Sequence, residues 1–126
     1  MSADHAAWFA KGEEDLAMVE LAIAGQGPWP QICYHAQQLA EKYLKGFLVF
    51  RGTLPPRIHD LPLLLDHCMI HDPTLDALRE ECIVLTELGA RARYPRWTEE
   101  PGEPEGRGAV AGAMRVRDAI LQRVSR

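Results

Sequence analysis

One stretch of the chain repeats polar side chains at the spacing of a helical face. His35, Gln38, Lys42 and Lys45 follow one another at intervals of three and four residues, so on a helix they form one stripe beside an apolar one. Imidazole, amide and ammonium groups in such a row could hold a phosphate or a ribose. The same row is also typical of an ordinary solvated helix face, in which Glu41 and Lys45 pair across one turn. The residues alone leave both interpretations open.

A second candidate for phosphate binding lies at the end of a predicted helix. Arg93 and Tyr94 stand among further cationic and aromatic residues, namely Arg91, Arg96 and Trp97. Guanidinium groups bind phosphate in a forked geometry and aromatic rings stack on bases, so this segment predicts contact with a nucleotide or with RNA. The alternative is structural: Arg93 neutralises the carboxyl end of the helix, and Tyr94 packs under the loop that follows.

His59 and Asp60 form a third candidate. An aspartate directly before a helix is usually its N-cap, and this role is predicted for Asp60. His59 could contact a ligand or simply hydrogen-bond within its turn. Folding could also bring His59 to Arg93, a pair suited to positioning a phosphate and transferring protons during RNA cleavage.

Motifs of better-defined chemistry are absent from the sequence. It has no glycine-rich phosphate loop, no His-Glu-x-x-His pair and no Gly-x-Ser-x-Gly elbow. The three cysteines, Cys33, Cys68 and Cys82, include no Cys-x-x-Cys pair. They are therefore predicted to be buried, apolar-like side chains rather than disulfides or zinc ligands. We predict neither a metal nor a cofactor.

Apolar residues at helical spacing predict the elements that must position these side chains. Long helices are expected at about residues 9–23, 30–51, 73–93 and 108–124, with Glu13, Glu14 and Glu20 turned outward from the first. Asp60 caps a short helix between the second and third of these. Residues 96–108, rich in Glu, Pro and Gly, are expected to form a mobile surface loop. The predicted fold is all-α, an antiparallel bundle of four long helices plus one short helix.

Length and charge limit the class of protein. The 126 residues fit one domain, residues 1–126, and the net charge of −4 argues against a general nucleic-acid coat. Residues 1–12 lack the apolar run of a signal peptide, and no stretch approaches the roughly 20 apolar residues of a membrane span. A cytoplasmic protein with no membrane association is expected. Its predicted core draws on all four long helices: Phe9, Leu16, Val19, Leu39, Tyr43, Phe47, Leu78, Leu85, Val116 and Ile120.

The motifs, taken in order, resemble the HEPN family of small helical domains, named for nucleotide binding in higher eukaryotes and prokaryotes. The most specific matches are the 37–45 stretch with its Ala40-Glu41-Lys42 core, the turn His59-Asp60-Leu61, and Arg93-Tyr94-Pro95 at the end of a helix. The resemblance implies a HEPN-like bundle that forms a homodimer. It also implies a small nucleotidyltransferase as partner, in a toxin–antitoxin or related pair, with the catalytic metal held by that partner.

Some members of this family are metal-independent ribonucleases that carry an arginine followed, after four to six intervening residues, by a histidine. Here Arg51 lies too far before His59 and Arg57 too close to it. Three hypotheses remain: a nucleotide-binding or partner-binding module beside a nucleotidyltransferase, a ribonuclease toxin, and a helical interaction module without a ligand. In the first, His35, Lys42, Lys45, His59 and Arg93 are the candidate nucleotide or phosphate contacts, and Tyr94 stacks on a base.

Overall fold

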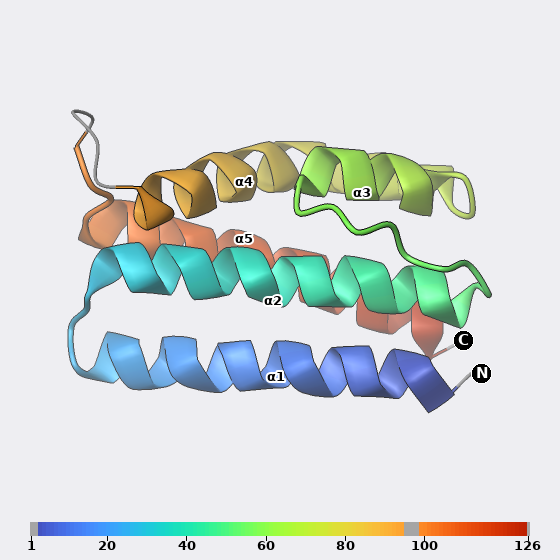
Figure 1. Cartoon of the computed structure of the whole chain (residues 1–126), viewed down its shortest axis with the longest axis horizontal. Helices are drawn as coiled ribbons and strands as arrows, with labels where there is room; N and C mark the ends of the chain where they lie inside the picture. Colours follow the sequence, from blue (N-terminus) through green and yellow to red (C-terminus); the bar gives the residue numbers. More distant parts are fainter. Residues whose placement is uncertain (1–2, 95–98, 126) are drawn as a thin grey trace.

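The computed structural model describes residues 3–94 and 99–125, and these form an all-helical bundle without strands (Figure 1). The helices are α1 (Ala3–Ala24), α2 (Trp29–Phe50), α3 (Leu61–Met69), the 3-10 helix η1 (Pro73–Leu78), α4 (Arg79–Arg93) and α5 (Glu103–Val124). The predicted fold class is confirmed, since α1, α2, α4 and α5 are the four long helices and α3 is the short one. No helix in the described residues has the length and apolar character needed to cross a membrane.

Helix α2 lies at the centre of the bundle, between α1 on one side and α3, α4 and α5 on the others (Figure 1). Its apolar stripe is fully buried at Ile32, Leu39 and Phe47. Eight of the ten predicted core residues are buried, and the other two, Phe9 and Leu16, are partly buried and pack against the core. Each large aliphatic or aromatic side chain that is buried stabilises the fold by about 1.5–3 kcal/mol, so the core around α2 supplies most of the driving force for folding.

The contact between α1 and α2 depends on a glycine. A Cβ atom at Gly46 would lie 2.4 Å from an aromatic carbon of Phe9 and 3.1 Å from the Cβ of Trp8. Only a hydrogen fits there, so α1 can approach α2 closely at this level. The close approach also places the Trp8 ring over α2, with the Lys45 ammonium 5.8 Å from the ring centroid.

The start of the last helix differs from the prediction. It begins at Glu103 rather than near residue 108, so six residues assigned to a mobile loop are helical. Pro104 is tolerated in a first helical turn, and the Glu105 carboxylate accepts a hydrogen bond from Gly102 N at 2.9 Å. Gly106 is required because a Cβ there would lie 2.7 Å from the Trp29 ring. Residues 96–98 of the predicted loop lie outside the described part of the chain.

Asp60 and Asp72 were each predicted to precede a helix. Asp60 caps α3 as predicted, accepting from Leu63 N at 3.1 Å. Asp72 likewise caps the next element, but residues 73–78 form the 3-10 helix η1, so the predicted fourth helix begins as a tighter turn before α4. The reason is local, since Pro73 cannot donate a hydrogen bond and the Asp72 side chain binds Thr74 N at 3.0 Å.

The three cysteines are buried and free, as predicted. Burial raises the pKa of Cys33 to about 11 and the pKa values of Cys68 and Cys82 to about 12. The thiols therefore stay protonated near neutral pH, and they act as small apolar side chains.

Candidate functional site

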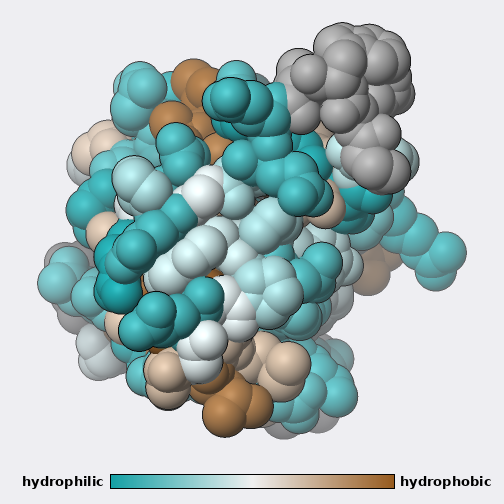
Figure 2. All heavy atoms as spheres, turned by 90° about the vertical axis from the view of Figure 1, so that its left-hand side faces the viewer, coloured by the Kyte–Doolittle hydropathy of each residue, from teal (hydrophilic) through white to brown (hydrophobic). Residues whose placement is uncertain are grey.

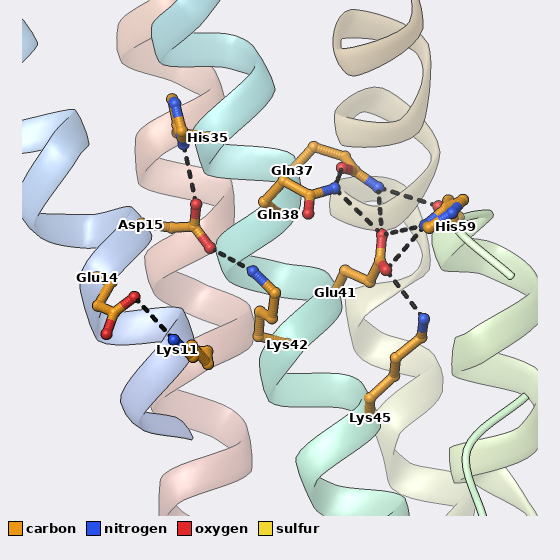
Figure 3. A network of polar contacts seen from close by, with 10 residues as sticks. All are labelled: Lys11, Glu14, Asp15, His35, Gln37, Gln38, Glu41, Lys42, Lys45 and His59. Carbon is orange, nitrogen blue, oxygen red and sulfur yellow. Dashed lines mark hydrogen bonds and ion pairs between the residues drawn. The ribbon is translucent and has the colours of Figure 1, made fainter. Parts of the chain in front are cut away.

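The polar stripe of α2 is organised around a buried carboxylate. The Glu41 side chain is 4% exposed, and it accepts hydrogen bonds from Lys45 Nζ at 3.0 Å and His59 Nδ1 at 2.9 Å (Figure 3). The side-chain amides of Gln37 and Gln38 donate to the same carboxylate at 3.3 and 3.4 Å. A buried charge persists only when opposite charge and hydrogen bonds replace its water, and these four groups do so. The predicted pairing of Glu41 with Lys45 is confirmed.

The segment between α2 and α3 fixes His59 against Glu41. Gln37 Nε2 donates to the His59 carbonyl oxygen at 3.0 Å, and Leu61 N, the first of α3, donates to Thr86 Oγ1 on α4 at 3.0 Å. A carboxylate only accepts, so His59 Nδ1 carries the hydrogen that points at Glu41. The imidazole is nevertheless 66% exposed. Its Nε2 is therefore the face that remains for a ligand or a proton transfer.

A second carboxylate, Asp15 on α1, occupies the other side of the stripe. It lies 2.7 Å from Lys42 Nζ and 2.9 Å from His35 Nδ1, and its side chain is 11% exposed (Figure 3). These contacts join α1 to α2 and neutralise Lys42 within the bundle. No sequence pattern indicated this cluster, because Asp15 precedes its partners by 20 and 27 residues.

Arg93 and Tyr94 lie at the end of α4, near the start of α2. The Arg93 guanidinium lies 5.9 Å from the ring centroid of Tyr34 and 5.8 Å from that of Tyr94, both within the range of a cation–π contact. Within the described residues, no carboxylate pairs with Arg93. Figure 2 views this end of the bundle and shows mainly hydrophilic and neutral residues, with hydrophobic atoms in separate spots near its edges. Of the other residues predicted here, those at 95–97 lie outside the described part of the chain.

The predicted site residues therefore fall into three groups. Lys45 and His59 share Glu41, Lys42 and His35 share Asp15, and Arg93 and Tyr94 form a cation–aromatic pair. The contact point of Arg93 on α2, Tyr34, and that of His59, Glu41, are seven residues apart, which corresponds to about 10 Å along a helix. The described structure contains no hydrogen bond or ion pair between His59 and Arg93.

A further ionic group lies on the other face of the α1–α2 pair. Glu13, predicted to turn outward, has a side chain that is 43% exposed, and it accepts from Arg117 Nε of α5 at 2.7 Å and from the Tyr43 hydroxyl. The hydrogen bond from Arg117 is the main cause that lowers the Glu13 pKa below its usual value. Burial, followed by the contact with Glu13, raises the pKa of Tyr43 to about 12. The pairing with Arg117 was not predicted, because the two residues are 104 positions apart in sequence.

Comparison with known proteins decides the family. The model of the HEPN domain matches residues 5–124. The chain belongs to the HEPN family. Its HEPN fold is shared by TT1696 from Thermus thermophilus, with a TM-score of 0.77 and 22% identity over 94% of this chain and 96% of that chain. ST0689, an archaeal HEPN homologue, has a TM-score of 0.76 and 25% identity over 95% of this chain and 97% of that chain. A search of curated proteins found no significant match.

In this HEPN domain the two lysines of the α2 stripe are matched by two carboxylates, Lys42 by Asp15 and Lys45 by Glu41. Across residues 3–94 and 99–125, no group of three His, Cys, Asp or Glu side chains is placed to hold a metal ion. The arrangement supplies one exposed imidazole oriented by a carboxylate, His59 on Glu41, and one exposed guanidinium beside aromatic rings, Arg93. Both groups can meet a ligand without losing a carboxylate partner.

Proposed function

We propose that this HEPN domain is a non-catalytic binding module that works with a small nucleotidyltransferase in a cytoplasmic toxin–antitoxin or related pair. The observation that supports a non-catalytic role is the internal neutralisation of α2. Lys42 and Lys45, the two ammonium groups expected to hold a phosphate, instead pair with Asp15 and Glu41 at 2.7 and 3.0 Å. A phosphate would have to displace a largely buried carboxylate, and leaving such a charge unpaired costs about 3–5 kcal/mol. The stripe is better suited to holding the bundle together than to catalysis.

The partner hypothesis is tested by co-expression. A reading frame beside this one that carries a Gly-Ser and paired-Asp nucleotidyltransferase signature is expressed with a tagged form of this chain. We expect the two proteins to co-purify at a fixed ratio and the nucleotidyltransferase to retain its metal-dependent activity in the complex. Separate elution of the two proteins at micromolar concentration would reject the partnership.

Self-association is proposed through the outward side of α4. Ile83 and Val84 are 46% and 42% exposed there, and Leu63 on the adjoining α3 is 48% exposed. Apolar side chains at the centre of an interface are typical of homodimers. Light scattering is expected to give twice the monomer mass of 14.1 kDa. Ile83→Glu with Val84→Glu should give the monomer, whereas Glu87→Lys, on an exposed side chain of the same helix, should be less disruptive. A wild-type monomer at micromolar concentration would exclude the homodimer.

The nucleotide contact of the module is proposed at Arg93, with Tyr94 stacking on the base and the exposed ring of His59 as a secondary contact. His35, Lys42 and Lys45 would reach the ligand only if it displaced their carboxylate partners. The support for this order is that no described carboxylate neutralises Arg93. Arg93→Glu should weaken binding of a nucleotide in calorimetric titration by about 1.5–3 kcal/mol, as expected for a hydrogen bond to a charged group. Raised salt should have a similar effect. The matched control is Arg51→Glu, which changes an exposed arginine at the end of α2.

The competing structural role of Arg93 gives the opposite result. If the guanidinium only stabilises the end of α4, Arg93→Glu lowers the melting temperature and leaves nucleotide affinity unchanged. Thermal unfolding and titration on the same variant therefore decide between a ligand contact and a helix cap.

A ribonuclease is the second candidate function, and one observation favours it. His59 is held through Nδ1 by the buried Glu41 while its ring stays exposed, which is the arrangement of a general base oriented by a carboxylate. Growth arrest on expression that is relieved by His59→Ala, together with metal-independent cleavage of RNA by the purified protein, would support this candidate. Absence of both effects leaves the binding module.

A further inference from the structure

A cleft lies at the end of the bundle opposite the α1–α2 turn. It is enclosed by the first turns of α1, the last turns of α2 and the segment that follows α2, which meet at the right-hand end of Figure 1. Its volume is about 540 Å³, within the range of small-molecule sites. The lining is mainly apolar and includes four charged residues. The apolar residues are Ala7, Trp8, Val49, Leu54, Pro55 and Pro56, and the charged ones are Asp4, Lys11, Lys45 and Arg57.

The walls of the cleft are built before any ligand arrives. Gly52, at φ +79°, turns the chain out of α2, and Thr53 Oγ1 lies 2.9 Å from His71 Nε2 beyond α3. Pro55 and Pro56 then hold the segment extended, because proline fixes φ and cannot continue a helix. On the opposite wall, Trp8 is held against α2 by the close approach at Gly46 described above. A rigid cavity avoids the entropy cost of ordering a loop on binding.

Two of the three cations that line the cleft already have carboxylate partners. Lys11, Lys45 and Arg57 line it together with one acid, Asp4. Lys45 is held by Glu41, and Lys11 pairs with Glu14 where both side chains are about two-thirds exposed. Arg57 is exposed and has no carboxylate partner among the described residues. Its guanidinium is thus the cation of the cleft that is available to an anion.

The apolar part of the lining is accessible to a bound molecule. Leu54 belongs to this lining and is 90% exposed, so its side chain is accessible to a bound molecule. The same lining contains the Trp8 indole and the rings of Pro55 and Pro56. Such a lining suits a flat apolar body, which would cover Leu54 and stack on the indole.

We propose that this cleft binds a small organic anion with a flat apolar body, its ring system against Trp8, Leu54 and the two prolines, and its single carboxylate or phosphate group at Arg57. The site is separate from the Arg93 contact and does not depend on the proposed partnership. Charge selects the anion, and the apolar walls contribute most of the affinity.

The test uses three naphthalene probes of matched ring size: 1-naphthoate, 1-naphthyl phosphate and the neutral 1-naphthalenemethanol. Binding to the full chain is followed by two-dimensional nuclear magnetic resonance, in which the indole N–H of Trp8 is assigned with Trp8→Phe. We expect at least one anion to shift the Trp8 signal in a saturable manner and to bind at least about tenfold more tightly than the neutral probe. The anionic probe that binds more tightly shows whether the cleft prefers a carboxylate or a phosphate group.

Two arginine variants make the result specific to the cleft. Arg57→Gln should weaken the anion about tenfold or more while leaving the neutral probe unchanged, because only the charged hydrogen bond is lost. Arg51→Gln, an exposed arginine outside the lining, should leave both unchanged. Equal binding of anion and neutral probe, equal effects of the two variants, or no shift of the Trp8 signal at millimolar probe would each overturn the proposal.

Discussion

Replacing Glu41 by glutamine tests whether the polar cluster of α2 is a structural device. The substitution keeps the shape of the side chain but removes the negative charge that faces Lys45, whose side chain is only 8% exposed. Removing one partner of a buried pair costs about 3–5 kcal/mol, because the other charge is left without compensation. The glutamine oxygen can still accept one hydrogen bond, so we expect a loss near the lower end, about 3 kcal/mol. For a domain of this size that corresponds to a fall in melting temperature of roughly 10 °C.

The measurement is urea unfolding at neutral pH, with a matched pair as control. Glu103 and Arg107 have the same four-residue helical spacing as Glu41 and Lys45, but their side chains are 56% and 54% exposed. Glu103→Gln should therefore cost no more than about 0.5 kcal/mol. If the two substitutions cost the same within about 1 kcal/mol, Lys45 is well hydrated through the neighbouring cleft, and the argument from a buried charge is wrong.

A double variant separates the effect of the paired charges from the effect of side-chain packing at Glu41 and Lys45. Glu41→Met with Lys45→Met replaces both members by flexible apolar side chains, and such replacements of buried ion pairs are often neutral or stabilising. We expect the double variant to regain most of the stability lost in Glu41→Gln. Recovery should be incomplete, since His59 and Gln37 lose their acceptor.

Two further predictions concern packing and pH. Gly46→Ala should destabilise by about 1–3 kcal/mol, because the clash at 2.4 Å with Phe9 outweighs a gain in helix propensity of about 1 kcal/mol. Gly108→Ala has open space around its Cβ, so it should stabilise by about that propensity gain. The unfolding midpoints of both variants check the sign of each change. Arg117→Gln should lower the free energy of unfolding at neutral pH. The pKa of Glu13 is lowered in the folded state, so the stability that its ion pair contributes is present above the usual pKa of 4.5 and is lost as the carboxylate is protonated. The difference in stability between the variant and the wild type should therefore shrink as the pH falls below 4.5. A difference that stays constant from pH 7 to pH 3 would show that Arg117 acts through packing alone.

The helices were predictable because their signals are local. The three-and-four spacing of Leu39, Tyr43 and Phe47 defines the buried face of α2, and the cap at Asp60 follows from the residue and its neighbours. The same local rules misplaced the start of α5. Proline and glycine around residue 104 predicted a loop, but Pro104 suits a first helical turn and Glu105 caps Gly102 N, which is a local pattern for a helix start. The contact of Gly106 with the Trp29 ring is tertiary and leaves no such pattern.

The ionic contacts show the same division. Glu41 and Lys45 were recognisable as a pair because they are four residues apart on one helix. Asp15 was not recognisable as the partner of Lys42, nor Glu13 as the partner of Arg117, because each pair joins two helices whose rotation about their axes the sequence does not specify. A charged residue on a helix face can thus be predicted to lie there without any indication of what it meets.

The availability of a cation, rather than its presence on a face, therefore decides where an anion can bind. Lys42 and Lys45 stand in the most regular pattern of the sequence, yet both are held by carboxylates that are largely removed from water. Arg57 and Arg93 lie outside that stripe, in the segment between α2 and α3 and at the end of α4, and neither faces a carboxylate within the described residues. Since an anion gains little from a charge that is already neutralised, and its binding must leave no buried carboxylate unpaired, the two arginines are the better positions at which to look for ligands. A parallel titration of Arg57→Gln and Arg93→Glu with one aromatic phosphate assigns the anion to the cleft or to the end of α4, because the two side chains lie on different elements and a single bound molecule should respond to one substitution and not to the other.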